Sequence, residues 1–469
     1  MILKQFYLGC LSQASYLIAD GPGGDAALVD PRRDVDVYLE EARQLGVTIR
    51  HVLLTHFHAD FVSGHLELRK ATGADIRMGA KAKPEYAFLP MQDGEVLELG
   101  AIRIKTLETP GHTPESVCYA VYEGDPAHTA PHAILTGDTL FIGDVGRPDL
   151  MASSGVSAET LAGKLYDSLR NKIMTLPDSI IIYPGHGAGS MCGKNLSSET
   201  SSPLGVQRKL NPMLRSDLGR EEFIRIVTAD QPSVPAYFGY DAWYNRQEHV
   251  TLDENLSRVL VPLAMADVLR LEGERAQLLD VRDPFAFAKR HVRNSINIGL
   301  EGTFATWAGT LLDRERPLIL LAVPGQEREA AMRLGRIGFD RILGYLKGGP
   351  DGEDVPAELL RSADRVNAIE LKERLGGVNP PLVLDVRNTR ERETKHIPST
   401  LHIPLADLAT HFAEVPKGKE IVVQCAGGYR SSMAASMLRA QGYASVEDLI
   451  GGIGAWEKAG LPLQAEATV

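Results

Sequence analysis

Residues 55–65 read THFHADFVSGH, and this short stretch decides how the first half of the chain is interpreted. His56, His58 and Asp60 follow the apolar run HVLL, which is typical of a buried strand. Imidazole and carboxylate groups are common metal ligands, and loops at strand ends often carry functional residues. Position 61, where a further ligand could stand, holds phenylalanine. The stretch therefore predicts a metal site at a strand end with one apolar corner.

The same pattern recurs at three other places before residue 190. His112 lies in ETPGHTP, Asp138 follows HAILTG, and His186 lies in IIIYPGHG. A single histidine at a strand end is usually structural, but four histidines and an aspartate in the same kind of place indicate metal binding. Helical patterns such as VDVYLEEARQLG separate some of the strand-like runs, so we expect a mixed α/β fold.

The motifs THFHAD, TPGHTPES, ILTGDTLF and YPGHG, in this order, resemble the metallo-β-lactamase superfamily across almost all of residues 1–250. The resemblance implies an αββα sandwich. Hydrolases of that superfamily bind two metal ions with an HxHxDH motif, whose last histidine corresponds to Phe61 in this chain. Because a phenyl ring cannot bind a metal, the second site would keep only Asp60, His186 and a share of Asp138, and we expect it to be weakened.

Within the superfamily, these motifs resemble those of persulfide dioxygenases, which are mononuclear iron enzymes. Two histidines and one carboxylate with open positions form the arrangement of non-haem Fe(II) oxygenases. Many members of that branch keep a histidine at position 61, so Phe61 supports a single metal without requiring it. Affinity alone does not choose iron over zinc. The resemblance implies that His56, His112 and Asp138 bind the iron, and that His58, Asp60 and His186 surround these ligands, orient them and hold water.

Two other residues are weaker candidates for substrate binding. Arg147, in GDVGRPDL, could hold a substrate carboxylate, and a surface ion pair is the alternative interpretation. Cys192 lies in the Gly/Ser-rich segment 185–202, whose backbone amides could line a pocket for an anion. Its thiol is either a sulfur on the substrate side or an inert buried group.

The second half of the chain contains an internal repeat. LLDVRDPFAFAKRHVRNSINI at 278–298 matches LVLDVRNTRERETKHIPSTLHI at 382–403. A period near 100 residues is too long for a solenoid, so it indicates two copies of a compact domain. Each copy alternates strand-like and helical patterns, which predicts a central parallel sheet. We therefore expect three domains, at 1–252, 253–360 and 361–469.

The last copy contains a cysteine in a glycine-rich loop. In IVVQCAGGYRSSMAASMLRAQGY, Cys425 ends an apolar strand, and a helix is predicted to begin near Ser431. Gly427, Gly428 and Arg430 place backbone amides and a cation around the sulfur, and the helix points its positive end there. These features lower a thiol pKa below its free value of about 8.5. We expect a reactive thiolate.

Residues 365–465, from LVLDVR through HIP to CAGGYRS and GGIGAW, resemble the rhodanese family. The resemblance implies that Cys425 carries sulfur and that Arg430 and the loop amides cradle an anion. The middle copy reads LILLAVPGQEREAAMRL at this place, and the chain has no cysteine between 193 and 424. We therefore expect the middle copy to carry no persulfide and to be a spacer, a docking surface or a vestige.

Composition excludes several classes of protein. A net charge of −11 leaves no basic surplus for nucleic acid, and there is no apolar run of about 18 residues for a membrane. The first ten residues show no targeting pattern. Four scattered cysteines form no disulfide framework, so we expect a reducing, cytoplasmic location.

The resemblances together imply an iron-dependent persulfide dioxygenase joined to an inactive and an active rhodanese domain, acting in sulfide detoxification. Expected partners are a low-molecular-weight persulfide, O₂, thiosulfate and glutathione or a similar thiol, and a homo-oligomer is compatible with the sequence. One alternative is a glyoxalase II-like thioester hydrolase with two zinc ions. Another is a sulfur-relay or redox-sensing scaffold with a structural metal. Phe61 and the rhodanese copies argue against the hydrolase, and an open ligand set argues against the scaffold.

Overall fold

The computed structural model describes residues 1–124, 130–150, 155–194, 196–229, 231 and 234–465. The chain divides into two compact units. The first comprises Met1–Asn255 together with Gly335–Gly338, and the second comprises Leu256–Leu334 and Phe339–Val469. Within the described residues, no helix combines the length and the apolar character that crossing a membrane requires.

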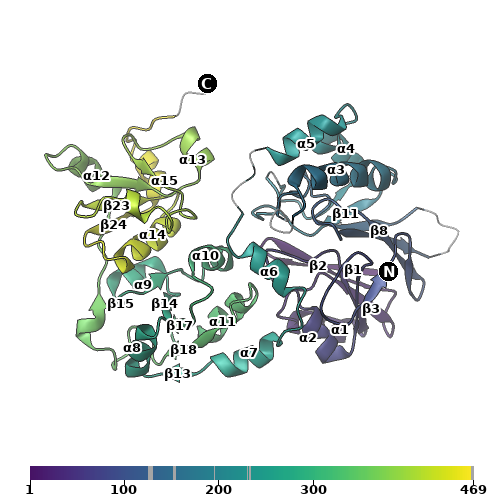
Figure 1. The fold of residues 1–469 in the computed structure, drawn as a ribbon, viewed down its shortest axis with the longest axis horizontal. Coiled ribbons are helices and arrows are strands. Elements are labelled where there is room, and N and C mark those ends of the chain that lie inside the picture. The colour runs from purple at the N-terminus through teal and green to yellow at the C-terminus, as the bar shows by residue number, and fades with distance from the viewer. Residues whose placement is uncertain (125–129, 151–154, 195, 230, 232–233, 466–469) are drawn as a thin grey trace. The chain divides into compact units, whose positions relative to one another are not determined.

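The first unit contains two six-stranded sheets, with strand orders β1-β2-β3-β4-β5-β6 and β12-β11-β10-β9-β8-β7. Figure 1 labels β1, β2 and β3 of the first sheet and β8 and β11 of the second. Strands β3 to β6 pair in parallel. Strands β7 to β10 pair antiparallel in sequence order, whereas β10 and β11 pair in parallel. The strands are β1 (Ile2–Leu8), β2 (Gln13–Ala19), β3 (Asp25–Val29), β4 (Thr48–Leu54), β5 (Asp75–Gly79), β6 (Leu89–Met91), β7 (Val96–Leu99), β8 (Ile102–Glu108), β9 (Val117–Glu123), β10 (Ala133–Gly137), β11 (Ile181–Pro184) and β12 (Ser202–Pro203).

Several apolar cores hold these layers together. Alternate residues of β2 serve two of them: Tyr16 and Ile18 pack between the sheets, and Leu17 and Ala19 pack under helices α1 and α2. A third core packs α3, α4 and α5 on the outer face of the second sheet. This αββα sandwich confirms the predicted fold class. Its helices are α1 (Asp36–Leu45), α2 (His65–Thr72), α3 (Ala158–Ser168), α4 (Leu204–Leu210), α5 (Arg220–Thr228) and α6 (Phe238–Tyr244).

The second unit contains two parallel five-stranded sheets with the same topology. Their orders are β13-β18-β17-β14-β16 and β20-β24-β23-β21-β22. The predicted duplication is confirmed. The sheet strands are β13 (Pro262–Leu263), β14 (Gln277–Asp280), β16 (Ile296–Asn297), β17 (Leu318–Leu321), β18 (Ile342–Leu346), β20 (Arg365–Val366), β21 (Leu382–Asp385), β22 (Leu401–His402), β23 (Ile421–Gln424) and β24 (Val446–Leu449), and β15 (His291–Val292) pairs with β19 (Leu360–Arg361).

Helices flank both sheets, and one of them joins the two copies. Asn297, at the end of β16, receives a hydrogen bond at its side-chain oxygen from Ser432 Oγ (3.0 Å) and donates its backbone N–H to Ser436 Oγ (2.9 Å), both on α14. Tyr429 Oη donates to the Gly299 carbonyl at 2.8 Å. The helices are α7 (Leu252–Val259), α8 (Met265–Gly273), α9 (Pro284–Lys289), α10 (Phe304–Leu311), α11 (Glu327–Gly335), α12 (Ala368–Leu375), α13 (Thr389–Thr394), α14 (Tyr429–Ala440) and α15 (Gly452–Lys458).

The strand register shows which middle-domain residue corresponds to the cysteine. Asp280 pairs with Leu321 in one sheet, as Asp385 pairs with Gln424 in the other. The next residue along the chain is Ala322 in the middle copy and Cys425 in the last. The middle copy therefore has a methyl group where the last copy has a thiol.

Candidate metal centre and cysteine loop

The predicted metal ligands and the neighbouring His186 all follow strands of the two sheets. His56 comes two residues after β4, Asp138 directly after β10, His186 two residues after β11, and His112 in the loop after β8. Because these strand ends meet at one edge of the sandwich, residues far apart in sequence come together there.

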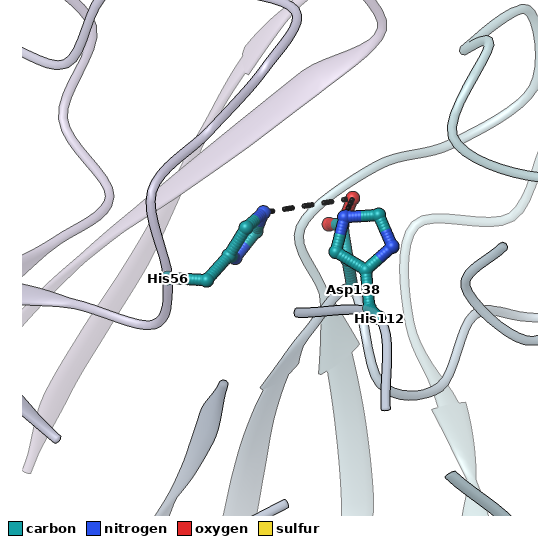
Figure 2. Close-up of side chains that lie close together, drawn as sticks. All are labelled: His56, His112 and Asp138. Atoms are coloured by element: carbon teal, nitrogen blue, oxygen red, sulfur yellow. Dashed lines mark ion pairs between the residues drawn. The ribbon is translucent and has the colours of Figure 1, made fainter. Parts of the chain in front are cut away.

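His56, His112 and Asp138 lie close together, as Figure 2 shows. Nε2 of His56 lies 3.9 Å from Asp138 Oδ2, and Nε2 of His112 lies 3.5 Å from the same oxygen. Donor atoms about 2.0–2.2 Å from one tetrahedral ion lie roughly 3.3–3.6 Å apart, so this spacing suits a metal. All three side chains are buried, with relative exposures of 1%, 1% and 2%.

Hydrogen bonds orient the two imidazoles. Nδ1 of His56 lies 2.9 Å from Thr55 Oγ1, and Nδ1 of His112 lies 2.9 Å from the Arg147 carbonyl oxygen. Each histidine therefore turns Nε2 toward Asp138, an outer-shell arrangement typical of metal-binding histidines. Burial lowers the pKa of both histidines, and for His56 the neighbouring His58 lowers the pKa further. Both are held neutral, the form that binds a metal.

Asp138 and His186 form a charged pair beside these ligands. Nδ1 of His186 lies 2.9 Å from Asp138 Oδ1, and Nε2 lies 2.8 Å from Asp60 Oδ2. Burial raises the pKa of Asp138, but the surrounding imidazoles outweigh it and hold that pKa well below its usual range. Burial lowers the pKa of His186, but the two carboxylates hold it well above its usual value. Asp138 is therefore ionised, as a metal ligand must be.

Phe61 fills part of the same site. Its side chain is fully buried, and its ring centroid lies 4.3 Å from that of His58 and 6.4 Å from that of His186. The position that supplies a histidine in the two-metal motif therefore presents only carbon to the centre.

Arg147 and Cys192 are linked through the backbone. The Arg147 amide donates to the Cys192 carbonyl at 3.1 Å, and Nη1 of Arg147 donates to the Met191 carbonyl at 3.1 Å. The Arg147 guanidinium also forms a two-bonded pair with Asp149, with both distances 2.7 Å, and its side chain is 1% exposed. Arg147 is thus a buried, ion-paired residue. Its hydrogen bonds connect its own loop, whose carbonyl orients His112, to the loop of Cys192.

The cysteine loop lies in the second unit. The Cys425 sulfur is buried and accepts a hydrogen bond from the Gly428 amide at 3.1 Å. Gly428 has φ of 101°, a left-handed conformation that favours glycine, and it precedes helix α14 directly. An added Cβ at Gly427 would meet no atom within 4 Å. The helix start and one loop amide therefore face the sulfur, as the sequence predicts.

Arg430 reaches a carboxylate within this loop region. Its Nη1 and Nη2 donate to the two oxygens of Glu391, each at 2.7 Å. Burial raises the pKa of Glu391, but Arg430 outweighs it and lowers that pKa. These two hydrogen bonds fix the position of the Arg430 guanidinium. The role of Glu391 as its partner was not expected from the sequence.

Known families match three segments of the chain, one in each of the three expected domains. The metallo-beta-lactamase superfamily matches residues 8–186, and the rhodanese-like domain matches residues 267–352 and 367–459. A metallo-beta-lactamase structure from Staphylococcus aureus is 32% identical, with a TM-score of 0.64, and the match covers 74% of this chain and 98% of that one. The chain belongs to the metallo-β-lactamase superfamily. Two rhodanese-like domains follow its metallo-β-lactamase domain.

Curated relatives of the metallo-β-lactamase domain carry different names. The human mitochondrial persulfide dioxygenase ETHE1 is 29% identical over 232 residues, covering 48% of this chain and 80% of that protein. The hydroxyacylglutathione hydrolase GloC of Haemophilus influenzae is 29% identical over 214 residues, covering 41% of this chain and 88% of that protein. Identity alone therefore does not distinguish dioxygenase from hydrolase.

Two residues of the metallo-β-lactamase domain support the centre and were not expected from the sequence. Asp30 accepts hydrogen bonds from the Thr55 amide (2.8 Å) and hydroxyl (2.7 Å), and its Oδ1 lies 3.1 Å from His58 Nε2. It follows β3 directly, so the strand-end pattern could have identified it. Asn245 donates to the carbonyls of His58 and Phe61, both at 2.8 Å. No local pattern marks Asn245, because it lies far along the chain.

Proposed function

We propose that the metallo-β-lactamase domain oxidises a low-molecular-weight persulfide, of the glutathione type, to sulfite with a single Fe(II) at His56, His112 and Asp138. The observation that carries this proposal is the buried set of two neutral imidazoles and one ionised carboxylate. That donor set leaves positions open on the metal. Phe61 supports a single ion, because it removes the imidazole of the two-metal motif.

Iron(II), when bound, supplies open positions for the substrate sulfur and O₂ and the electrons that O₂ activation needs. In the balanced reaction one persulfide, one O₂ and one water give one thiol, one sulfite and two protons. The chain's own residues fix the geometry: Thr55 and the Arg147 carbonyl orient the imidazoles, and Phe61 keeps one wall apolar.

The C-terminal domain would transfer sulfane sulfur through Cys425. The thiolate attacks the outer sulfur of thiosulfate, the sulfur–sulfur bond of thiosulfate breaks, and sulfite leaves with the electron pair. The resulting Cys425 persulfide passes its outer sulfur to a thiol such as glutathione, which regenerates the thiolate. Both halves then handle sulfane sulfur, which fits a role in sulfide detoxification.

The competing function is hydrolysis of a glutathione thioester by a two-zinc centre. The similarity to GloC, at the same identity as that to ETHE1, is the observation in its favour. O₂ uptake by anaerobically purified, iron-loaded protein with glutathione persulfide separates the two, with sulfite as the expected product. We expect about one iron per chain, and two zinc ions with thioesterase activity would overturn the proposal. His112→Ala should lose both iron and O₂ uptake, whereas His186→Ala should keep much of the iron.

A further inference from the structure

A cavity of about 450 Å³ lies between the two rhodanese-like copies, within the second unit. Segments 291–295 of the middle copy, 361–364 of the connection and 439–447 of the last copy contribute to its walls. Helix α14 begins at the cysteine loop and ends at this cavity, and its twelve residues span about 18 Å. The cavity is therefore separate from the sulfur site. Its volume falls within the range of about 300–1,000 Å³ that is typical of small-molecule sites.

Three arginines line the cavity, namely Arg293, Arg361 and Arg439. Nη2 of Arg439 donates to the Val446 carbonyl at 2.5 Å, and Nη1 of Arg361 donates to two backbone carbonyls. Within the part of the chain that the structure describes, neither of these two guanidiniums forms an ion pair. Burial lowers the pKa of Arg439 although carboxylates lie in the neighbourhood, so its positive charge is incompletely compensated. The cavity thus presents two cations without a counterion.

Two carboxylates also line the cavity, those of Asp364 and Glu447. Glu447 accepts hydrogen bonds from Arg374 at 2.9 and 3.2 Å, so its charge is already matched. Arg293 similarly has a carboxylate oxygen of Glu272 at 3.9 Å. Among the described residues, these pairs leave two unpaired guanidiniums and one unpaired carboxylate at the cavity, in a chain whose net charge is −11. The local balance of charge therefore favours an anion.

The end of helix α14, which borders the cavity, is capped. Its last carbonyls, those of residues 437–439, accept hydrogen bonds from the backbone amides of Gln441, Gly442 and Tyr443. Arg439 lies in the last turn, where a cation offsets the partial negative charge of a helix C-terminus. The carbonyl dipoles of the helix therefore oppose an anion in the cavity only weakly.

His291 brings an unused ring nitrogen to the cavity. Its side chain is 4% exposed, and Nδ1 donates to the Phe287 carbonyl oxygen at 2.9 Å. Nε2 has no hydrogen-bond partner among the described residues. Burial, and to a smaller extent Arg439, Arg282 and Arg361, lower the pKa of His291 to about 4. The ring is therefore neutral, and Nε2 can accept a hydrogen bond from a hydroxyl group of a ligand.

We propose that this cavity binds a phosphate monoester of a small polar molecule, such as a sugar phosphate. Guanidinium groups form paired hydrogen bonds with phosphate oxygens, so Arg361 and Arg439 would hold the dianionic head. Hydroxyl groups of the ligand would bond to His291 Nε2 and to the hydroxyls of Ser362 and Ser445, which have no partner among the described residues. A phosphate ion alone would leave most of the cavity unfilled. The inference is independent of the persulfide and thiosulfate reactions.

Hydrogen exchange with mass spectrometry on the full-length protein tests this proposal. The probe is glucose 6-phosphate near pH 8, where its phosphate carries two negative charges. We expect slower exchange at 291–295, 361–364 and 439–447, because the ligand would join these segments. Inorganic phosphate and glucose should each require an at least about tenfold higher concentration for the same effect, because each makes only part of the hydrogen bonds. Unchanged exchange in these segments, or an equal effect of inorganic phosphate or of glucose, would overturn the proposal.

Two arginine variants should weaken the binding. Arg361→Gln and Arg439→Gln should each raise the half-saturating concentration of glucose 6-phosphate by at least about tenfold, because each removes charged hydrogen bonds to the phosphate. The Arg361 side chain is exposed, so its replacement should leave the fold intact. Wild-type affinity in either variant would overturn the proposal.

Two further arginine variants serve as matched controls. Arg341→Gln changes another arginine of the same unit, one that donates to a backbone carbonyl away from the cavity, and Arg430→Gln removes the cation of the cysteine loop. Both should bind glucose 6-phosphate with wild-type affinity. A tenfold loss in Arg430→Gln would place the ligand in the cysteine loop and overturn the proposal. Because these measurements use binding alone, they can fail or succeed whether or not the protein consumes O₂ with persulfide.

Discussion

The middle and C-terminal rhodanese-like domains share a strand order and a buried Asp–Arg pair. A cysteine follows the central strand β23 of the C-terminal domain, but none follows the equivalent strand β17 of the middle domain. In the middle domain, Arg282 Nη2 lies 2.7 Å from Asp280 Oδ2. In the last domain, Arg387 Nη2 lies 2.6 Å from Asp385 Oδ2. All four residues are at most 2% exposed. The structural pair is therefore retained with or without the thiol.

The two loops also differ in charge. Helix α11 of the middle domain has Glu327 and Glu329 in its first turn, whereas α14 has no acidic residue there and carries Arg430. Negative side chains at a helix start oppose a bound anion, and a cation favours one. The buried pair is thus common to the fold of both domains, and we expect sulfur transfer to depend on one further side chain and the charge around it.

The largest expected effect comes from Cys425→Ser. The serine hydroxyl keeps nearly the same volume but stays protonated near neutral pH, so thiosulfate sulfurtransferase activity should fall by at least about 10³-fold. The iron-dependent O₂ uptake should persist, because Cys425 lies in a different unit from the metal ligands. Sulfurtransferase activity above a tenth of the wild-type value would show that another residue carries sulfur. The cysteine would then not explain the difference between the two copies.

The second effect concerns the buried pairs. Asp385→Asn leaves Arg387 buried without its carboxylate, which should lower the local free energy of unfolding by about 3–5 kcal/mol. Asp280→Asn should cost less, because Arg282 keeps a contact of 2.9 Å with Asp351. Hydrogen exchange with mass spectrometry on the full chain, read at 278–298 and 382–403, measures both. Equal costs would show that Asp351 contributes nothing.

A smaller effect is expected for Arg430→Ala. The helix start and the Gly428 amide still favour an anionic sulfur, so sulfur transfer should fall only about tenfold. Arg430→Lys keeps the charge but cannot form both bonds with Glu391, and it should fall between the alanine variant and wild type. Steady-state sulfur transfer from thiosulfate to glutathione gives the comparison. If Arg430→Ala lost as much sulfur-transfer activity as Cys425→Ser, the guanidinium would be essential for the transfer.

The smallest effect is expected when the middle copy receives a thiol. Ala322→Cys, made in the Cys425→Ser background, restores the cysteine at the matching register position. Transfer should stay at roughly 1% of wild type or less, because the acidic first turn of α11 disfavours a thiolate. Adding Glu327→Arg should then raise it. Substantial activity from Ala322→Cys alone would mean that the missing sulfur is the only difference that matters.

Much of this architecture could be predicted from local patterns. The strand-end pattern predicted that His56, His112 and Asp138 lie together, and the structure places them together, because strand ends gather at one edge of a sheet. The duplicated DVR motif identified two copies of one fold. Both signals are local or repeated, so they can be read without tertiary structure.

The supporting contacts could not be predicted in the same way. Asn245, the residue after α6, reaches the loop carrying His58, and Glu391 reaches Arg430 from α13. Cys192 reaches Asp60 and His186 from a Gly/Ser-rich loop whose path has no periodic signal. Such contacts depend on how distant segments pack, which no short motif encodes.

The hydrogen bonds between α14 and the middle copy, at Asn297 and Gly299, limit how this protein can be rearranged by evolution. The helix that begins at the sulfur loop has two serines and a tyrosine bonded to the neighbouring copy. Loss of the middle domain would remove the bonds that the Ser432 and Tyr429 hydroxyls make to it, so we expect the last domain to fold less well when it is moved alone to another protein. A copy without a cysteine of its own can therefore still be required, as the structural neighbour of one that has it.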